Sequence, residues 1–207
     1  MKKKNLALGA LLPSAFLQLP EVLQEAHDST RASVRAREPL AHWLRSQGGP
    51  SASVAMLDVG AVAALSGLRV IDTGGLTDAR VARLLHESHG FYRGYLFGPD
   101  AQGAGAIARL VLGDRPSFVV LLLSDELPWL LERRPLADGQ PVPFIAAYQQ
   151  DRALFEAPGF GDGYQYLCSV ASEPSPEGWV WHYNVFSRKE LGLTPARPDA
   201  EGRTRCF

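Results

Sequence analysis

Two aspartates have the type and position for chemistry, because each closes a short apolar run that predicts a buried strand. Asp58 follows the run 53–57, and Asp72 ends the run 68–72. The carboxyl ends of parallel strands border the crevice in which ligands bind. Two carboxylates there can serve as acid and base, bind sugar hydroxyls or hold a cation. They can also accept hydrogen bonds from loop amides and only shape their turns.

The segment around these aspartates supplies the remaining candidates. Gly60, Gly74 and Gly75 would let backbone approach the crevice, and Thr77 or Asp78 is expected to cap the next helix. The predicted ligand-binding residues are Asp58, Gly60, Asp72, Gly75, Thr77 and Asp78.

Common cofactor and catalytic motifs are missing from the sequence. It has no G-x-G-x-x-G, no P-loop and no G-x-S-x-G nucleophile elbow. His86 and His89 share a helix face, but without a third ligand we interpret them as helix-end histidines rather than a metal pair. We therefore expect no cofactor and no metal, and we identify no catalytic residue.

The elements that must position these residues alternate along the chain. The segment 20–47 has helical apolar spacing, and strand, short helix, strand and helix follow from 53 to about 87, which predicts a parallel βαβ unit. A helical patch at 104–112 precedes the strongly apolar run 118–124, whose composition predicts a central strand buried on both faces. The segment 126–133 is interpreted as a helical turn, and the pattern of 144–155 is ambiguous. Alternating aromatic segments at 164–172 and 178–187 predict an antiparallel hairpin.

The fold class predicted from this order is α/β, with a three-layer-like sheet, a parallel βαβ core and a C-terminal antiparallel hairpin. In the second hairpin segment, Trp179, Trp181 and Tyr183 share one face, with His182 on the other. Such a face suits sugar stacking, but core packing is the commoner use.

Length and charge limit the organisation and the partners. The 207 residues, with net charge −1, suit one domain and give no basic field for nucleic acid. We expect a signal-like segment or membrane-helix remnant at 1–19, an α/β domain at 20–193 and a tail at 194–207. Lys2, Lys3 and Lys4 precede an apolar run at 6–19 that is too short to span a membrane. This start favours an extracytoplasmic, periplasmic protein, either free or membrane-anchored. In such a compartment Cys168 and Cys206 can form a disulfide, and the alternative is two separate thiols.

The stretch from Asp58 to Arg83 resembles the soluble extracytoplasmic C-terminal region of bacterial polytopic membrane glycosyltransferases of the GT-C type, specifically the arabinofuranosyltransferase/mannosyltransferase-like group. The family pattern is roughly D-x-G-x-x-x-Y-x-S-G-x-x-V-I-D-x-x-G-L-T-D, followed by a helix with I-A-R. The aromatic before S-G is replaced here by Ala64 or Leu65. The matching residues are Asp58, Gly60, Ser66, Gly67, Val70, Ile71, Asp72, Gly75, Leu76, Thr77, Asp78, Ala82 and Arg83.

The resemblance implies a role in membrane-linked assembly of cell-envelope glycans. In that family the membrane part carries the catalytic carboxylates, so the resemblance implies an accessory domain that is not catalytic alone. Its expected partners are a glycan or polyprenyl-linked sugar and a membrane glycosyltransferase or membrane segment. Two alternatives stay open: a small independent hydrolase that uses Asp58 and Asp72, and a structural docking module.

Overall fold

The computed structural model describes residues 35–87, 102–123, 125–126, 149–174, 178 and 180–207. The helix predicted over 20–47 is present over 35–48, and its earlier part lies outside the described residues. The segment 1–19, His89, Trp179 and the possible turn at 127–133 also lie outside them. No helix in the described ranges is long and apolar enough to cross a membrane.

Five strands form one mixed sheet in the order β2-β1-β3-β5-β4. Strands β1 (Ser53–Met56), β2 (Arg69–Asp72) and β3 (Phe118–Leu123) are parallel, whereas β4 (Tyr164–Ala171) and β5 (His182–Arg188) pair antiparallel. Strand β3 is central and entirely buried, as its unbroken apolar run predicts. The predicted parallel core and C-terminal hairpin are therefore confirmed.

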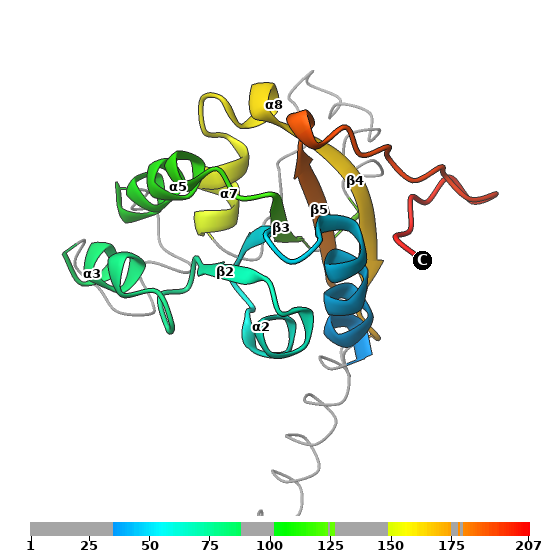
Figure 1. Ribbon diagram of the computed structural model, residues 1–207, viewed down its shortest axis with the longest axis horizontal. Coiled ribbons are helices and arrows are strands. Elements are labelled where there is room, and N and C mark those ends of the chain that lie inside the picture. The colour runs from blue at the N-terminus through cyan, green and yellow to red at the C-terminus, as the bar shows by residue number, and fades with distance from the viewer. Residues whose placement is uncertain (1–34, 88–101, 124, 127–148, 175–177, 179) are drawn as a thin grey trace, which may run out of the picture.

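Helices cover both faces of the sheet and make three layers (Figure 1). Helix 35–48 and α2 (Gly60–Ser66) pack on one face through Leu40, Leu44 and Val62. On the other face lie α3 (Ala79–Glu87), α5 (Gln102–Asp114), α7 (Gln149–Phe155) and α8 (Phe160–Gly163). The helical patch expected at 104–112 is thus α5, and the described part of the ambiguous stretch is helical. A short 3₁₀ turn, η1 (Lys189–Leu191), follows β5.

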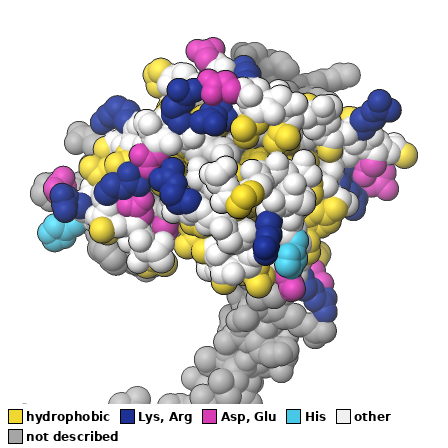
Figure 2. All heavy atoms as spheres, in the orientation of Figure 1, with side chains coloured by type: hydrophobic (Ala, Val, Ile, Leu, Met, Phe, Trp, Pro, Cys, Tyr) yellow, Lys and Arg dark blue, Asp and Glu magenta, His cyan; other side chains and the backbone are white. Residues whose placement is uncertain are grey.

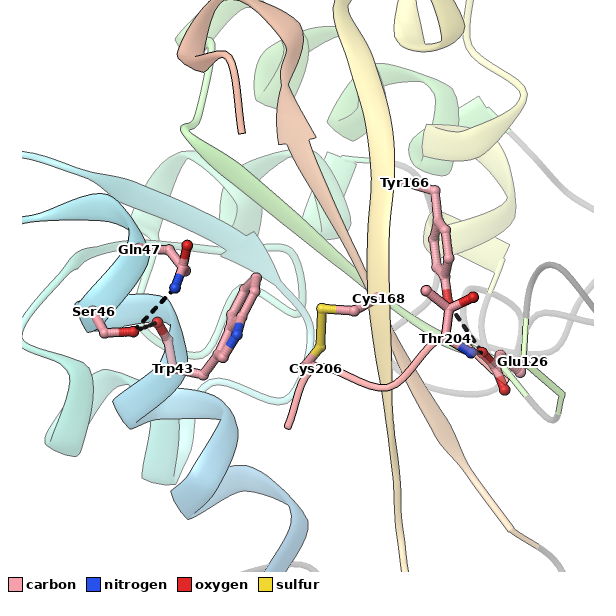
Figure 3. The surroundings of a disulfide bond; sticks show 8 residues. All are labelled: Trp43, Ser46, Gln47, Glu126, Tyr166, Cys168, Thr204 and Cys206. Carbon is pink, nitrogen blue, oxygen red and sulfur yellow. Dashed lines mark hydrogen bonds between the residues drawn. A yellow bond between two sulfur atoms is a disulfide. The ribbon is translucent and has the colours of Figure 1, made fainter. Parts of the chain in front are cut away.

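The C-terminal tail is tied to strand β4. Cys168 and Cys206 form a disulfide, which settles the choice between a bridge and two thiols (Figure 3). Beside it the Ser169 amide donates to the Thr204 carbonyl at 2.8 Å, and the Cys206 amide donates to the Ser169 carbonyl at 3.2 Å. The Thr204 amide also donates to the Glu126 carboxylate at 2.6 Å. The tail therefore continues the sheet beyond β4.

The aromatic residues at the start of β5 belong to the core. Tyr183 is 4% exposed, and the partly buried Trp181 packs against the same apolar cluster. Their common face is therefore turned inward against helix 35–48 and α2. This arrangement leaves no exposed aromatic platform on the described part of β5.

Candidate functional site

The candidate site lies at the carboxyl edge of the three parallel strands. The chain crosses from β1 to β2 by α2 on one face, and from β2 to β3 by α3 and α5 on the other. Strand order therefore reverses beside β1, and in open α/β sheets ligands bind outside the carboxyl ends at this switch point. Asp72 ends β2 opposite Met56 of β1, and Asp58 follows two residues after Met56. Both aspartates are at the predicted edge.

Both carboxylate oxygens of Asp72 accept hydrogen bonds from its own loop. Its side chain is completely buried, and Oδ1 accepts a hydrogen bond from the Gly74 amide at 2.8 Å. Oδ2 accepts from the amide of Thr77 at 2.7 Å and from its hydroxyl at 3.1 Å. Three donors compensate the burial of this carboxylate. Asp72 and Thr77 thus fold the loop 72–78, and both oxygens of the buried Asp72 carboxylate are used within that loop.

Gly75 and Asp78 join the same loop to α3. Gly75 has φ +73°, and a Cβ there would lie 2.8 Å from Leu85 Cδ1 and 3.0 Å from the Ala82 amide nitrogen. Asp78 caps the helix, since its Oδ1 accepts from the Arg80 amide at 3.0 Å. The hydrogen bond from the Arg80 guanidinium holds the pKa of Asp78 below its usual value. Of the two predicted caps, Asp78 is the one used.

Gly60 begins α2 and is exposed. A Cβ at this position would meet no described atom within 4 Å. The packing therefore does not require glycine there, in contrast with Gly75. Gly60 is near Asp58 in the chain, but it belongs to the helix rather than to the loop 72–78.

Asp58 forms a separate, partly buried cluster with Arg37 and Tyr183. The Arg37 guanidinium pairs with Asp58 Oδ2, and their side chains are 20% and 29% exposed. The Tyr183 hydroxyl donates to the same Oδ2 at 3.2 Å and accepts from Arg37 Nε at 3.1 Å. Burial raises the pKa of Tyr183 to about 12, so the phenol stays protonated at neutral pH. The cluster presents a fixed carboxylate, a guanidinium and a phenol at the carboxyl edge.

The structure does not join the two aspartates into one acid–base pair. Asp58 is bonded to helix 35–48 and β5, whereas Asp72 is bonded within its own loop, and they share no partner among the described contacts. Candidate residues thus separate into the loop 72–78 and the Asp58 cluster. The contacts of Arg37 and Tyr183 with Asp58 were not predicted, since Tyr183 was considered only as part of an aromatic face. One feature of the sequence could have indicated this site. Arg37 lies at helical spacing from the buried Leu40 and Leu44, which places a cation on an otherwise apolar helix face.

A second group that sequence reasoning missed is buried in α7. Gln150 and Asp151 are each 1% exposed. Asp151 Oδ2 accepts a hydrogen bond from the Leu122 amide at 2.8 Å, near the carboxyl end of β3. Burial raises the pKa of Asp151 to about 7. The sequence pattern did not predict that these two residues are buried, because a polar run such as Gln-Gln-Asp-Arg normally lies on an exposed face.

The described ranges contain no cluster of side chains suited to a metal ion. No group of three or more His, Cys, Asp or Glu side chains there could hold an ion. His86 is exposed in the last turn of α3, where a histidine suits the helix dipole. Charged side chains of both signs are interspersed on the face in Figure 2, so this face carries no broad basic patch.

Comparison with known proteins gives one match. The family model Domain of unknown function (DUF8728) matches residues 24–181. The match covers the sheet up to the start of β5, including Arg37, both aspartates and α7. No curated protein and no solved structure matches the chain.

Proposed function

For this chain, which belongs to the family Domain of unknown function (DUF8728), we propose the role of an extracytoplasmic domain that binds a sugar and assists cell-envelope glycosyl transfer. Sugar binding takes place at the carboxyl edge of the parallel strands. The domain does not catalyse the transfer alone. Its partner is a membrane glycosyltransferase, and the sugar is part of a glycan or of a polyprenyl-linked donor.

The partly buried cluster of Asp58, Arg37 and Tyr183 carries this proposal. Sugar hydroxyls both donate and accept hydrogen bonds, and a carboxylate beside a guanidinium offers both functions in a fixed geometry. Arg37 and Tyr183 both bond to Asp58 Oδ2, which orients the carboxylate, and among the described contacts Oδ1 has no partner that would compete with a ligand hydroxyl. The position at the switch point is the one at which open α/β sheets bind ligands.

The disulfide and the family resemblance support the location and the partner. Disulfides form and persist in oxidising compartments such as the periplasm, and the Cys168–Cys206 bridge fits that setting. The resemblance over Asp58–Arg83 supports glycan assembly at a membrane partner that supplies the catalytic carboxylates.

The alternative of a hydrolase that uses Asp58 and Asp72 is less well supported. A catalytic carboxyl must reach its substrate, whereas Asp72 is completely buried and accepts three hydrogen bonds from its own loop. Without an accessible Asp72, the pair of carboxyls that this alternative requires is incomplete.

A binding screen tests the proposal. Purified protein is applied to an array of envelope glycans and titrated with polyprenyl-phosphate sugars, together with Asp58→Asn and Asp162→Asn. Asp162 is an exposed carboxylate in α8 and serves as the matched control. We expect saturable binding that Asp58→Asn weakens and Asp162→Asn preserves. A folded wild-type protein that binds no glycan and no lipid-linked sugar would exclude the proposal and favour a docking module.

A further inference from the structure

The first turn of α7 buries two polar side chains with very few partners. Within the described residues, both amide atoms of Gln150, Oε1 and Nε2, lack a hydrogen-bond partner, although the residue is only 1% exposed. Asp151, equally buried, has the Leu122 amide as its one hydrogen-bond donor within the described part of the chain. Neither side chain forms an ion pair with a described cation. An acceptor and an amide are thus enclosed with most of their hydrogen-bonding capacity unused.

This pair lies where strand β1 ends and β3 continues. Strand β1 pairs with β3 only at Val54↔Phe118 and Ala55↔Val119. Strand β3 continues to Leu123, paired on its other side with β5. The Leu122 amide is therefore beyond the last β1 pair, and the Asp151 carboxylate occupies the place of a strand neighbour. This is the switch point reached from the face of α3, α5 and α7, opposite the face of the Asp58 cluster.

Such a pair is costly unless something else completes it. A buried polar group without a hydrogen bond costs about 1–3 kcal/mol, and native proteins keep few of them. In contrast with Asp72, no set of loop amides compensates Asp151. An unused buried donor and acceptor at a ligand crevice are therefore groups for a bound molecule to satisfy.

The chemistry of the pair selects the ligand. A carboxyl group without a neighbouring cation disfavours an anion, and the described residues hold no ligand set for a metal ion. Gln150 offers one donor group and one acceptor, the pattern that adjacent hydroxyls of a sugar ring match. Because burial raises the pKa of Asp151 to about 7, this carboxyl can both donate and accept near neutral pH. A neutral polyhydroxyl ligand fits better than a charged one.

We infer that Gln150 and Asp151 line the α7 side of the crevice between the ends of β1 and β3, across the sheet edge from the Asp58 cluster, and hydrogen-bond ring hydroxyls of a sugar bound there. This inference rests on the proposed function and assigns the residues that select the sugar. Both side chains are 1% exposed in this structure, so a sugar reaches them only after a local opening that exposes them. Association is accordingly slower than a rigid open pocket would allow.

The experiment compares Gln150→Met with Gln149→Met. Methionine has a similar length and no strong hydrogen-bonding group, and Gln149 is the half-buried neighbour of the same type. Urea unfolding is measured without ligand, and binding is measured with methyl glycosides of mannose, galactose, glucose and arabinose. We expect Gln150→Met to raise the unfolding midpoint and to weaken the sugar that binds best at least tenfold. Gln149→Met is expected to leave that affinity unchanged.

The outcomes separate the inference from the function that it extends. If the wild-type protein binds a sugar and Gln150→Met and Asp151→Asn keep its affinity, the inference fails and the proposed function stands. A stabilised Gln150→Met variant with unchanged binding would assign the amide to packing alone. If the wild-type protein binds none of the glycosides, glycans or lipid-linked sugars, the proposed function fails and this inference fails with it.

Discussion

The Arg37 guanidinium and the Asp58 carboxylate form an ion pair that joins helix 35–48 to the loop after β1. The Tyr183 hydroxyl bonds to both groups from β5, so three elements distant in sequence meet at one carboxylate. The position of Asp58 is therefore set by tertiary contacts rather than by its own turn. This distinguishes Asp58 from Asp72, whose contacts are all local.

Breaking this ion pair is expected to destabilise the fold moderately. Arg37→Met leaves a partly buried carboxylate without its cation, which costs about 1–3 kcal/mol, toward the lower end because both side chains are part exposed. The free energy of unfolding in urea measures this loss. Arg152→Met is the control, since the Arg152–Glu156 pair is half exposed and its removal should cost less than about 0.5 kcal/mol. Equal losses in the two variants would contradict the structural role of the Arg37–Asp58 pair.

Removal of Asp72 is expected to harm folding more than its position at the crevice suggests. Asp72→Ala leaves the Gly74 and Thr77 amides without their acceptor, and we expect a loss of about 2–4 kcal/mol. Thr77→Val removes only the hydroxyl bond and should cost about 1 kcal/mol. The free energies of unfolding of both variants, measured by chemical denaturation, test these expected losses. A fully stable Asp72→Ala variant would show that the loop 72–78 does not depend on this carboxylate.

The stability of the protein should depend on the protonation of Asp151. Its pKa rises from 3.8 to about 7 on folding, so between these values the folded chain holds a proton that the unfolded chain has lost. The contribution of Asp151 to the free energy of unfolding is therefore full below pH 4 and decreases as the pH rises to 7. Asp151→Asn keeps an oxygen for the Leu122 amide and no longer titrates.

The difference in unfolding free energy between Asp151→Asn and wild type, measured from pH 4 to 8, isolates this contribution. We expect the variant to gain stability relative to wild type as the pH rises. Asp162→Asn, at an exposed position, should show no such trend. A flat difference for Asp151→Asn would mean that the carboxyl keeps an ordinary pKa in the folded protein.

The disulfide is expected to hold the tail and to stabilise the domain. The bridge closes a loop with a sequence separation of 38, which corresponds to about 4 kcal/mol in the chain-entropy model. A Cys168→Ala/Cys206→Ala variant should lose stability of this order, and a reducing agent should lower wild type to the level of the variant. Loss of the disulfide should also accelerate hydrogen exchange at the amides of residues 169 and 206, whose hydrogen bonds hold the tail against β4. An unchanged unfolding midpoint would show that the backbone ladder alone holds the tail.

The strands of the sheet could be predicted from the sequence because the patterns that indicate them are local. The apolar run at β3, the alternation in β4 and β5, and the strand-end positions of Asp58 and Asp72 all follow from periodicity over a few residues. Asp78 as a helix cap is likewise a local pattern. The βαβ unit and the hairpin could therefore be predicted in their correct classes.

The contacts between distant segments could not be predicted. Arg37, Asp58 and Tyr183 meet only because helix 35–48 packs across the sheet, and no spacing in the sequence encodes that meeting. Asp151 looks like a surface residue until β3 is seen to extend past β1. The disulfide also depended on β4 and the tail becoming neighbours, which two isolated cysteines do not specify.

The most direct test is a titration of the isotope-labelled protein with the best-binding sugar, followed by NMR of its backbone amides. The account predicts saturable shifts concentrated at 57–60 and near Arg37 and Tyr183, and their loss in folded Asp58→Asn but not in Asp162→Asn. Absence of saturable shifts with every sugar, or equal saturable binding by Asp58→Asn, would contradict it.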